Sequence, residues 1–139
     1  MKLPTQREIE DGIRFDGENI TIKKDIYFRV FGMWMVLPKG LQSDGASVPK
    51  IIFWVNRYDK RWLFWSIWHD YAYRSQWLPR NVADSIFAWG VKQNAPQWSF
   101  TFYLAVRVGG YFAWHRKKEI VKFPNAISRL NKFICKTQQ

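Results

Sequence analysis

The first third of the chain alternates hydrophobic and polar positions in short runs. These runs are rich in β-branched and aromatic residues, and turn residues such as Asp16-Gly17 and Gly32 stand between them. They cover residues 13–15, 20–22, 26–31 and 33–37. Short runs divided by turn residues predict a small antiparallel β-meander within residues 1–45. A polar loop of small residues, 42–48, is expected to follow the meander.

Beyond residue 58 the apolar positions recur at helical spacing, and prolines stand between the periodic stretches. This pattern predicts helices over residues 60–74, 79–93, 99–118 and 125–136. Asp59 is expected to be the N-cap of the first helix, and Pro79 is expected to open the second. Gly109-Gly110 falls inside the third, where it indicates close helix packing or a kink.

These two patterns together define the expected fold class as α+β. A small N-terminal antiparallel β-meander is followed by three or four packed helices. At 139 residues one domain is the default, so we expect a single domain over 1–139. Within it, 1–45 is mainly strands, 58–118 is the helical core, and 119–139 is a basic C-terminal helix or tail.

Composition narrows the class of protein. Hydrophobic residues make up 47% of the chain and include nine tryptophans, which is enough apolar matter for a sizeable core. A single cysteine, Cys135, excludes a disulfide framework and a cysteine-based zinc site. The N-terminus has no apolar stretch typical of a secretory signal peptide. Arg107 interrupts the longest stretch without charge, so we expect no membrane-spanning helix.

The chain is strongly basic, with a formal net charge of +11, and the excess is concentrated near its end. The residues expected to form a basic surface are Arg116, Lys117, Lys118, Lys122, Arg129 and Lys132. This surface is either a solvated helical face or a docking surface for phosphate groups. Nine tryptophans exceed what a core needs, and they fit either a membrane surface or a protein–protein interface.

The sharpest chemical feature is the stretch 68–74, where His69 and Tyr73 lie one helical turn apart. Such polar groups are costly in an apolar helix unless each finds a partner. Asp84 on the next helix is the candidate partner for His69. A carboxylate fixes the tautomer of an imidazole and supports the imidazolium, while the other ring nitrogen removes a proton from water. His69, Asp84 and Tyr73 are therefore the candidate catalytic residues.

Two further groups complete the candidate site. Asp70, beside His69, is the candidate ligand for a divalent cation, together with oxygens of the 42–48 loop. Asp44 and Ser47 in this loop are expected to lie over the site. A purely structural role stays open for all of these groups, because a buried His–Asp–Tyr network also ties helices together. The Asp44-Gly45 dipeptide is equally typical of an ordinary turn.

Four motifs in order carry a resemblance to a known family. They are Leu-Pro-Lys-Gly at 37–40, Ser-Asp-Gly-Ala-Ser-Val-Pro at 43–49, His-Asp-Tyr-Ala-Tyr-Arg at 69–74 and Ala-Asp-Ser-Ile-Phe at 83–87. Residues 25–115 thereby resemble an uncharacterised family of small bacteriophage and prophage proteins, a domain of unknown function. The resemblance implies a phage origin and supplies no activity.

A second resemblance concerns the His-Asp-x-x-Tyr motif with Ala-Asp on the following helix. This pair is similar to the core of phospholipase A2, especially the short form in parvovirus capsids. The resemblance implies that His69 is the general base, Asp70 a calcium ligand, Tyr73 an orienting hydroxyl and Asp84 the support of the histidine. Calcium is the only cofactor it implies, and no other cofactor is expected.

Three functions follow as hypotheses. The first is a phage virion or accessory protein of the tail or head-to-tail region, with other phage structural proteins as partners. The second is a lipid- or ester-cleaving hydrolase at the host envelope, on an anionic membrane surface. The third is a cytoplasmic host-takeover or anti-defence protein that binds a host protein. Nucleic acid ranks below these partners, because no motif that reads it is present. The expected location is the virion or the host cytoplasm.

Overall fold

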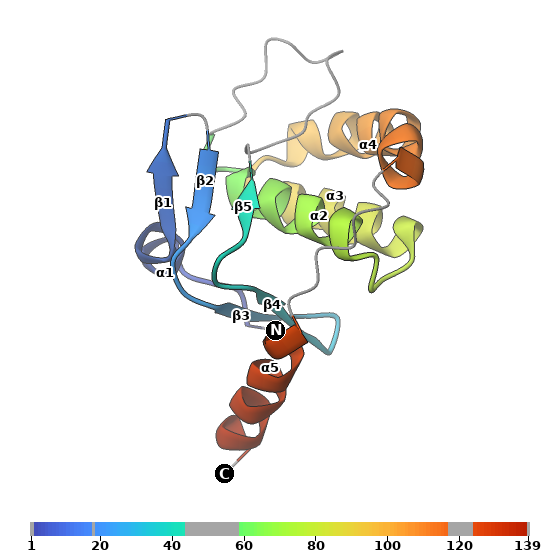
Figure 1. The fold of residues 1–139 in the computed structure, drawn as a ribbon. Coiled ribbons are helices and arrows are strands. Elements are labelled where there is room, and N and C mark those ends of the chain that lie inside the picture. Colours follow the sequence, from blue (N-terminus) through green and yellow to red (C-terminus); the bar gives the residue numbers. More distant parts are fainter. Residues whose placement is uncertain (1, 18, 44–58, 117–123, 139) are drawn as a thin grey trace. The chain divides into compact units, whose positions relative to one another are not determined.

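The computed structural model describes residues 2–17, 19–43, 59–116 and 124–138, without the side chains of Arg116 and Pro124. The chain divides into two compact units, one formed by 1–43 with 122–139 and the other by 44–121 (Figure 1). The α+β class expected from the sequence is confirmed, because antiparallel strands near the N-terminus are followed by helices. The single domain stays a prediction.

The strands of the first unit form two antiparallel sheets. β1 (Ile13–Asp16) pairs with β2 (Asn19–Ile22), and β2 pairs in turn with β5 (Gln42–Ser43). β3 (Ile26–Val30) and β4 (Met33–Leu37) form a separate hairpin. β5 begins where the sequence predicted only a polar loop. The inward positions of the strands hold the apolar core of this unit, as their alternation predicts.

The turn of the β3–β4 hairpin has two residues, Phe31 and Gly32, with φ angles of 48° and 78°. Two successive positive φ angles are typical of a type I′ turn, whose twist matches that of the strands. Gly32 adopts this conformation without strain, whereas Phe31 carries a Cβ that the left-handed region disfavours. The hairpin therefore holds one strained residue at its tip.

Two helices belong to the described part of the first unit. α1 (Gln6–Gly12) was not expected from the sequence, although Thr5 and Glu8 form a capping box at its start. α5 (Pro124–Thr137) matches the helix predicted over 125–136. Its inner face packs on β4 through Leu130 and Ala126.

The second unit consists, among its described residues, of three helices. They are α2 (Leu63–Ser75), α3 (Arg80–Asn94) and α4 (Pro96–Arg116). All three lie within three residues of the predicted bounds at each end. The expected cap at Asp59 is wrong, because α2 begins at Leu63 with Trp62 in the N-cap position. Asp59 accepts a hydrogen bond from the backbone N–H of Arg61 and closes the turn before the helix instead.

Glycine lets α2 and α3 approach closely. A Cβ atom on Gly90 would lie 2.0 Å from the indole ring of Trp65, so only glycine fits there. Trp62, Trp65 and Trp68 are all buried in this unit. They are core residues, so packing accounts for three of the nine tryptophans. None of the helices in the described segments is long and apolar enough to cross a membrane.

Candidate functional site

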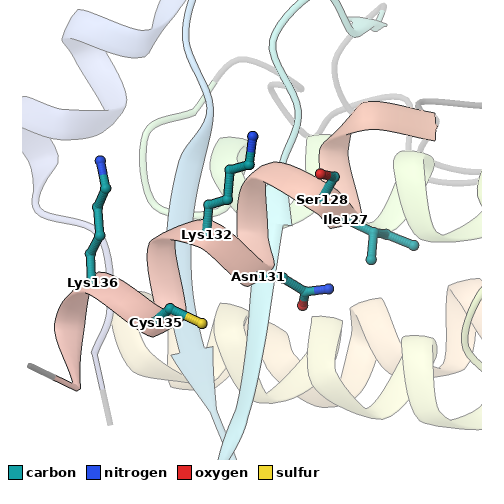
Figure 2. Close-up of a pocket in the computed structure, with 6 residues that line it drawn as sticks. All are labelled: Ile127, Ser128, Asn131, Lys132, Cys135 and Lys136. Carbon is teal, nitrogen blue, oxygen red and sulfur yellow. The ribbon is translucent and has the colours of Figure 1, made fainter.

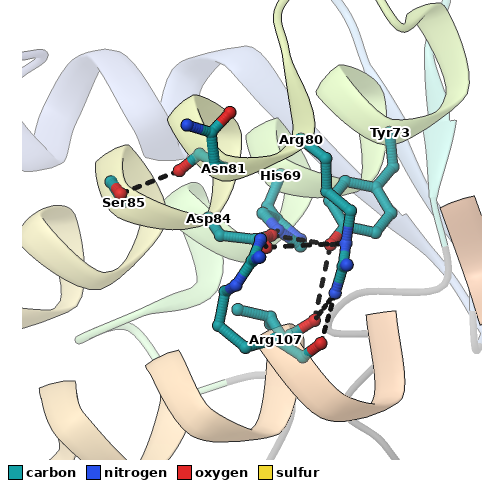
Figure 3. Close-up of polar contacts among 8 residues, drawn as sticks. His69, Tyr73, Arg80, Asn81, Asp84, Ser85 and Arg107 are labelled. Atoms are coloured by element: carbon teal, nitrogen blue, oxygen red, sulfur yellow. Dashed lines mark hydrogen bonds and ion pairs between the residues drawn. The ribbon is translucent and has the colours of Figure 1, made fainter. Parts of the chain in front are cut away.

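The predicted partners His69 and Asp84 lie in contact between α2 and α3 (Figure 3). The Nε2 atom of His69 is 2.8 Å from Oδ1 of Asp84, and the Tyr73 hydroxyl donates to the same oxygen at 2.6 Å. His69 and Tyr73 share this carboxylate because they are one turn apart on α2. The side chain of Asp84 has no exposed surface. The hydrogen-bonding pair expected from the sequence is therefore present and buried.

Two arginines that the sequence did not point to complete the surroundings of Asp84. Nη1 of Arg107, on α4, donates to Oδ2 of Asp84 at 2.8 Å. Nε of Arg80, one turn before Asp84 on α3, lies 3.7 Å from Oδ2. A buried carboxylate is stable only when cations and hydrogen bonds replace its hydration. Asp84 thus connects three helices through one side chain.

These contacts set the ionisation of Asp84 and Tyr73. Burial by itself raises the pKa of Asp84, but hydrogen bonds from His69, Tyr73 and Arg107 outweigh it and hold that pKa below its usual range. Burial and the hydrogen bond to Asp84 raise the pKa of the Tyr73 phenol. At neutral pH Asp84 is therefore a carboxylate, and Tyr73 keeps its proton and donates it.

The ionised carboxylate fixes the tautomer of His69. Since Asp84 has no proton to donate, the 2.8 Å contact requires the proton to be on Nε2 of His69. In the neutral ring Nδ1 then carries the lone pair. No hydrogen bond to Nδ1 is present in the part of the chain that the structure describes, and the side chain is 12% exposed. The ring is held by contacts with Tyr73 and Phe87, whose centroids lie 4.2 and 4.7 Å from its own.

A glycine on α4 makes room for this network. A Cβ atom on Gly110 would lie 2.4 Å from the Tyr73 hydroxyl, so α4 approaches α2 only with glycine at this position. Arg80 also reaches this contact between α2 and α4. Its Nε donates to the Tyr73 hydroxyl at 3.2 Å, and its Nη2 donates to the carbonyl of Val106 at 3.0 Å. Nη2 also contacts the carbonyl of Arg107. The close packing predicted at Gly109-Gly110 is confirmed at Gly110.

The candidate cation ligand Asp70 is buried on α2, and its carboxylate lies 3.4 Å from Nη1 of Arg74. Calcium takes six to eight oxygen ligands. No group of three or more acidic, histidine or cysteine side chains placed to hold a metal occurs among the described residues. Asp44 and Ser47, expected over the site, lie outside those residues, so the loop and the calcium site stay predictions. The described donors alone do not form a calcium site.

The expected basic surface is described only in part. Arg129 forms an ion pair with Asp25 inside the first unit and contributes little free charge. Lys132 and Lys136 line a shallow hollow of about 810 Å³ along α5, which Figure 2 shows. Arg116 ends α4, and its side chain is not described; Lys117, Lys118 and Lys122 lie outside the described residues.

Sequence reasoning missed Arg80 and Arg107, although each leaves a signal. Arg80 precedes Asp84 by four residues, which places both on one face of α3. Arg107 is the single charge within the apolar stretch 93–115. A lone cation among apolar helical positions indicates a buried anion nearby, because an unpaired buried charge is costly.

A family model described as a protein of unknown function (DUF1353) matches residues 20–106, which is more than half of the chain. The matched range includes His69, Tyr73 and Asp84. No curated protein and no solved structure matches the chain.

Proposed function

The chain belongs to the DUF1353 family, and we propose that it is a bacteriophage virion or accessory protein with a hydrolytic centre at His69 and Asp84. We assign it to the tail or head-to-tail region, located in the virion or the host cytoplasm. The phage origin is supported by the four ordered motifs between residues 37 and 87. The hydrolytic centre is supported by the geometry between α2 and α3.

The proposed reaction is hydrolysis of an ester, with a phospholipid as the substrate class. Nδ1 of His69 takes a proton from water as the water oxygen bonds to the ester carbonyl carbon. The ester C–O bond then breaks, and the proton passes from the imidazolium to the leaving alcohol. Asp84 stabilises the imidazolium, and Tyr73 holds the carboxylate in place. The products are a carboxylic acid and an alcohol.

One observation carries this proposal: the 2.8 Å contact between Nε2 of His69 and a carboxylate that is ionised at neutral pH. It leaves Nδ1 of the neutral ring as a base, which is what proton abstraction from water requires. The two arginines approach the other oxygen of Asp84, Oδ2, which leaves Oδ1 to His69 and Tyr73. They fix the carboxylate in the orientation that His69 needs.

A hydrolysis assay tests the centre. Anionic and zwitterionic phospholipids and a water-soluble ester are offered to the wild type with and without calcium. We expect His69→Ala to lower the rate by about a hundredfold or more, as the loss of a general base does. His115→Ala is the matched control, because His115 is the second histidine and is exposed on α4. A wild type as inert as His69→Ala on every ester would end the hydrolytic proposal.

Mass spectrometry of purified phage particles tests the location. We expect the protein in stoichiometric amounts in the virion or, for an accessory protein, in assembly intermediates bound to tail or head-to-tail components. Its absence from both would refute the virion assignment and leave the hydrolytic centre untouched.

A further inference from the structure

The outer face of α4 is apolar and exposed. Four large side chains, Phe100, Val108, Tyr111 and Phe112, are 52 to 70% exposed, and Leu104 between them is 46% exposed. At 100° per residue, spacings of four, four and three residues place Phe100, Leu104, Val108 and Tyr111 on one side of the helix, with Phe112 at its edge. These five side chains form the surface that we call the outer stripe.

The opposite side of α4 packs against the rest of the second unit. Phe102 and Val106 are buried there, and Gly110 contacts Tyr73. α4 is therefore apolar on both sides, a pattern that belongs to helices buried all round. Contiguous exposed apolar surfaces mark places where another molecule binds. The outer stripe is such a place, since nothing in the described part of the second unit buries it.

The charge of the second unit selects the partner. Between Asp59 and Arg116 the sequence holds seven lysines and arginines and three aspartates. Each aspartate is matched by an arginine within 3.4 Å. Among the described residues of this unit, a molecule approaching α4 therefore meets a net positive charge, and each carboxylate there is paired with an arginine. A second copy would bring the same positive field against itself, whereas an anionic surface is attracted.

At one end of the outer stripe, Lys92 and Phe100 line the same hollow. A depression of about 470 Å³ opens between α3 and α4, lined by Lys92, Ser99, Phe100 and Tyr103 among others. No acidic side chain lines it. An exposed ammonium group next to an exposed phenyl ring suits a lipid, which presents a phosphate and an acyl chain side by side.

We propose that the outer stripe of α4 docks on an anionic lipid bilayer. α4 lies parallel to the bilayer surface, Phe100, Val108 and Phe112 enter the boundary between head groups and acyl chains, and Lys92 meets lipid phosphates. The helix does not cross the bilayer. This docking uses none of the chemistry of His69, so it stands or falls apart from the hydrolytic proposal.

Vesicle flotation tests the docking with the full chain. Vesicles of phosphatidylcholine alone are compared with vesicles of phosphatidylcholine and phosphatidylglycerol in equal parts, at low and at high salt. We expect the wild type to float with the anionic vesicles and its partition to fall as salt screens the charge. The intrinsic tryptophan fluorescence then reports binding over a lipid titration.

A double substitution, Val108→Ser with Phe112→Ser, removes two side chains of the outer stripe. We expect its partition to anionic vesicles to fall about tenfold or more, because each side chain leaves the apolar phase. The matched control is Phe31→Ser with Ile127→Ser, two side chains of the first unit that are 57% and 60% exposed. The control is expected to bind as the wild type does, and all variants should unfold cooperatively.

Three results would overturn the docking. The wild type would fail to bind anionic vesicles, the two double variants would bind equally well, or sedimentation would show a dimer that Val108→Ser with Phe112→Ser abolishes. The last result would assign the outer stripe to a second copy of this chain. Vesicle binding without ester hydrolysis would support the docking and refute the hydrolytic centre, so the two failures are distinguishable.

Discussion

Replacing Gly110 by alanine tests the close approach of α4 to Tyr73. The new Cβ atom would lie 2.4 Å from the Tyr73 hydroxyl, whereas real Cβ atoms essentially never have contacts shorter than 3.0 Å. The hydroxyl must therefore retreat, but it donates to Asp84 at only 2.6 Å. Relief of the clash therefore requires that this buried hydrogen bond lengthens or that α4 moves outward.

The substitution has one stabilising and two destabilising effects, and their sum decides whether the free energy of unfolding rises or falls. Alanine gains about 1 kcal/mol of helix propensity over glycine. Overpacking costs about 1–3 kcal/mol, and weakening a hydrogen bond to a buried charge costs about 1.5–3 kcal/mol. We expect Gly110→Ala to lower the free energy of unfolding by about 2 kcal/mol. In a Tyr73→Phe background the nearest ring atoms lie 3.1 and 3.2 Å from the new Cβ atom, so the clash is milder. The helix-propensity gain of about 1 kcal/mol offsets most of it, and the same substitution should cost less than about 1 kcal/mol there.

Urea unfolding of the wild type, both single variants and the double variant measures this cycle. We expect a coupling free energy between positions 73 and 110 of about 1–3 kcal/mol, typical of residues in contact. Additive effects, within about 0.5 kcal/mol, would show that Gly110 does not control the position of the Tyr73 hydroxyl. That result would refute the inference that glycine at position 110 is needed for the close approach of α4 to Tyr73.

Three further predictions concern stability. Gly90→Ala should lower the free energy of unfolding by about 1–3 kcal/mol, because its Cβ would clash with the Trp65 ring; an unchanged urea midpoint would contradict this packing. Phe31→Asn should raise the free energy by about 1 kcal/mol, because asparagine tolerates the positive φ angle before Gly32; a lower thermal midpoint would be the opposite of this expectation. The lowered pKa of Asp84 means that its contribution is present above about pH 4 and is lost as pH falls through the folded-state pKa; Asp84→Asn should flatten this acid limb in an unfolding series, and an unflattened limb would show that Asp84 is not its source.

The helices of the second unit could be predicted because each leaves a local signal. Apolar residues recur at helical spacing, and Pro79 and Pro96 stand at the junctions. The contact between His69 and Asp84 was also within reach, since a buried polar residue on one helix calls for a partner on the next. These expectations needed only the periodicity of neighbouring helices.

Other features depend on contacts between distant residues. Arg107 lies 23 positions from Asp84, and no spacing rule relates residues on α3 and α4. α1 was missed because seven residues carry little periodicity, although its capping box at Thr5 and Glu8 is readable. The cap expected at Asp59 was placed three residues too early, because a turn precedes α2. The loop at 42–48 was expected over the site, and its residues from 44 on lie outside the described chain.

The central claim is that an ionised, buried Asp84 holds the proton of His69 on Nε2 and leaves Nδ1 as a base. A ¹⁵N–¹H correlation spectrum of the imidazole rings at about pH 8, where an ordinary histidine is neutral, measures this tautomer directly. His115→Gln identifies the signals of His69. We predict a protonated Nε2 and a bare Nδ1 in the wild type, and a mixture of tautomers in Asp84→Asn. A proton on Nδ1 in the wild type, or a tautomer that Asp84→Asn leaves unchanged, would contradict the claim.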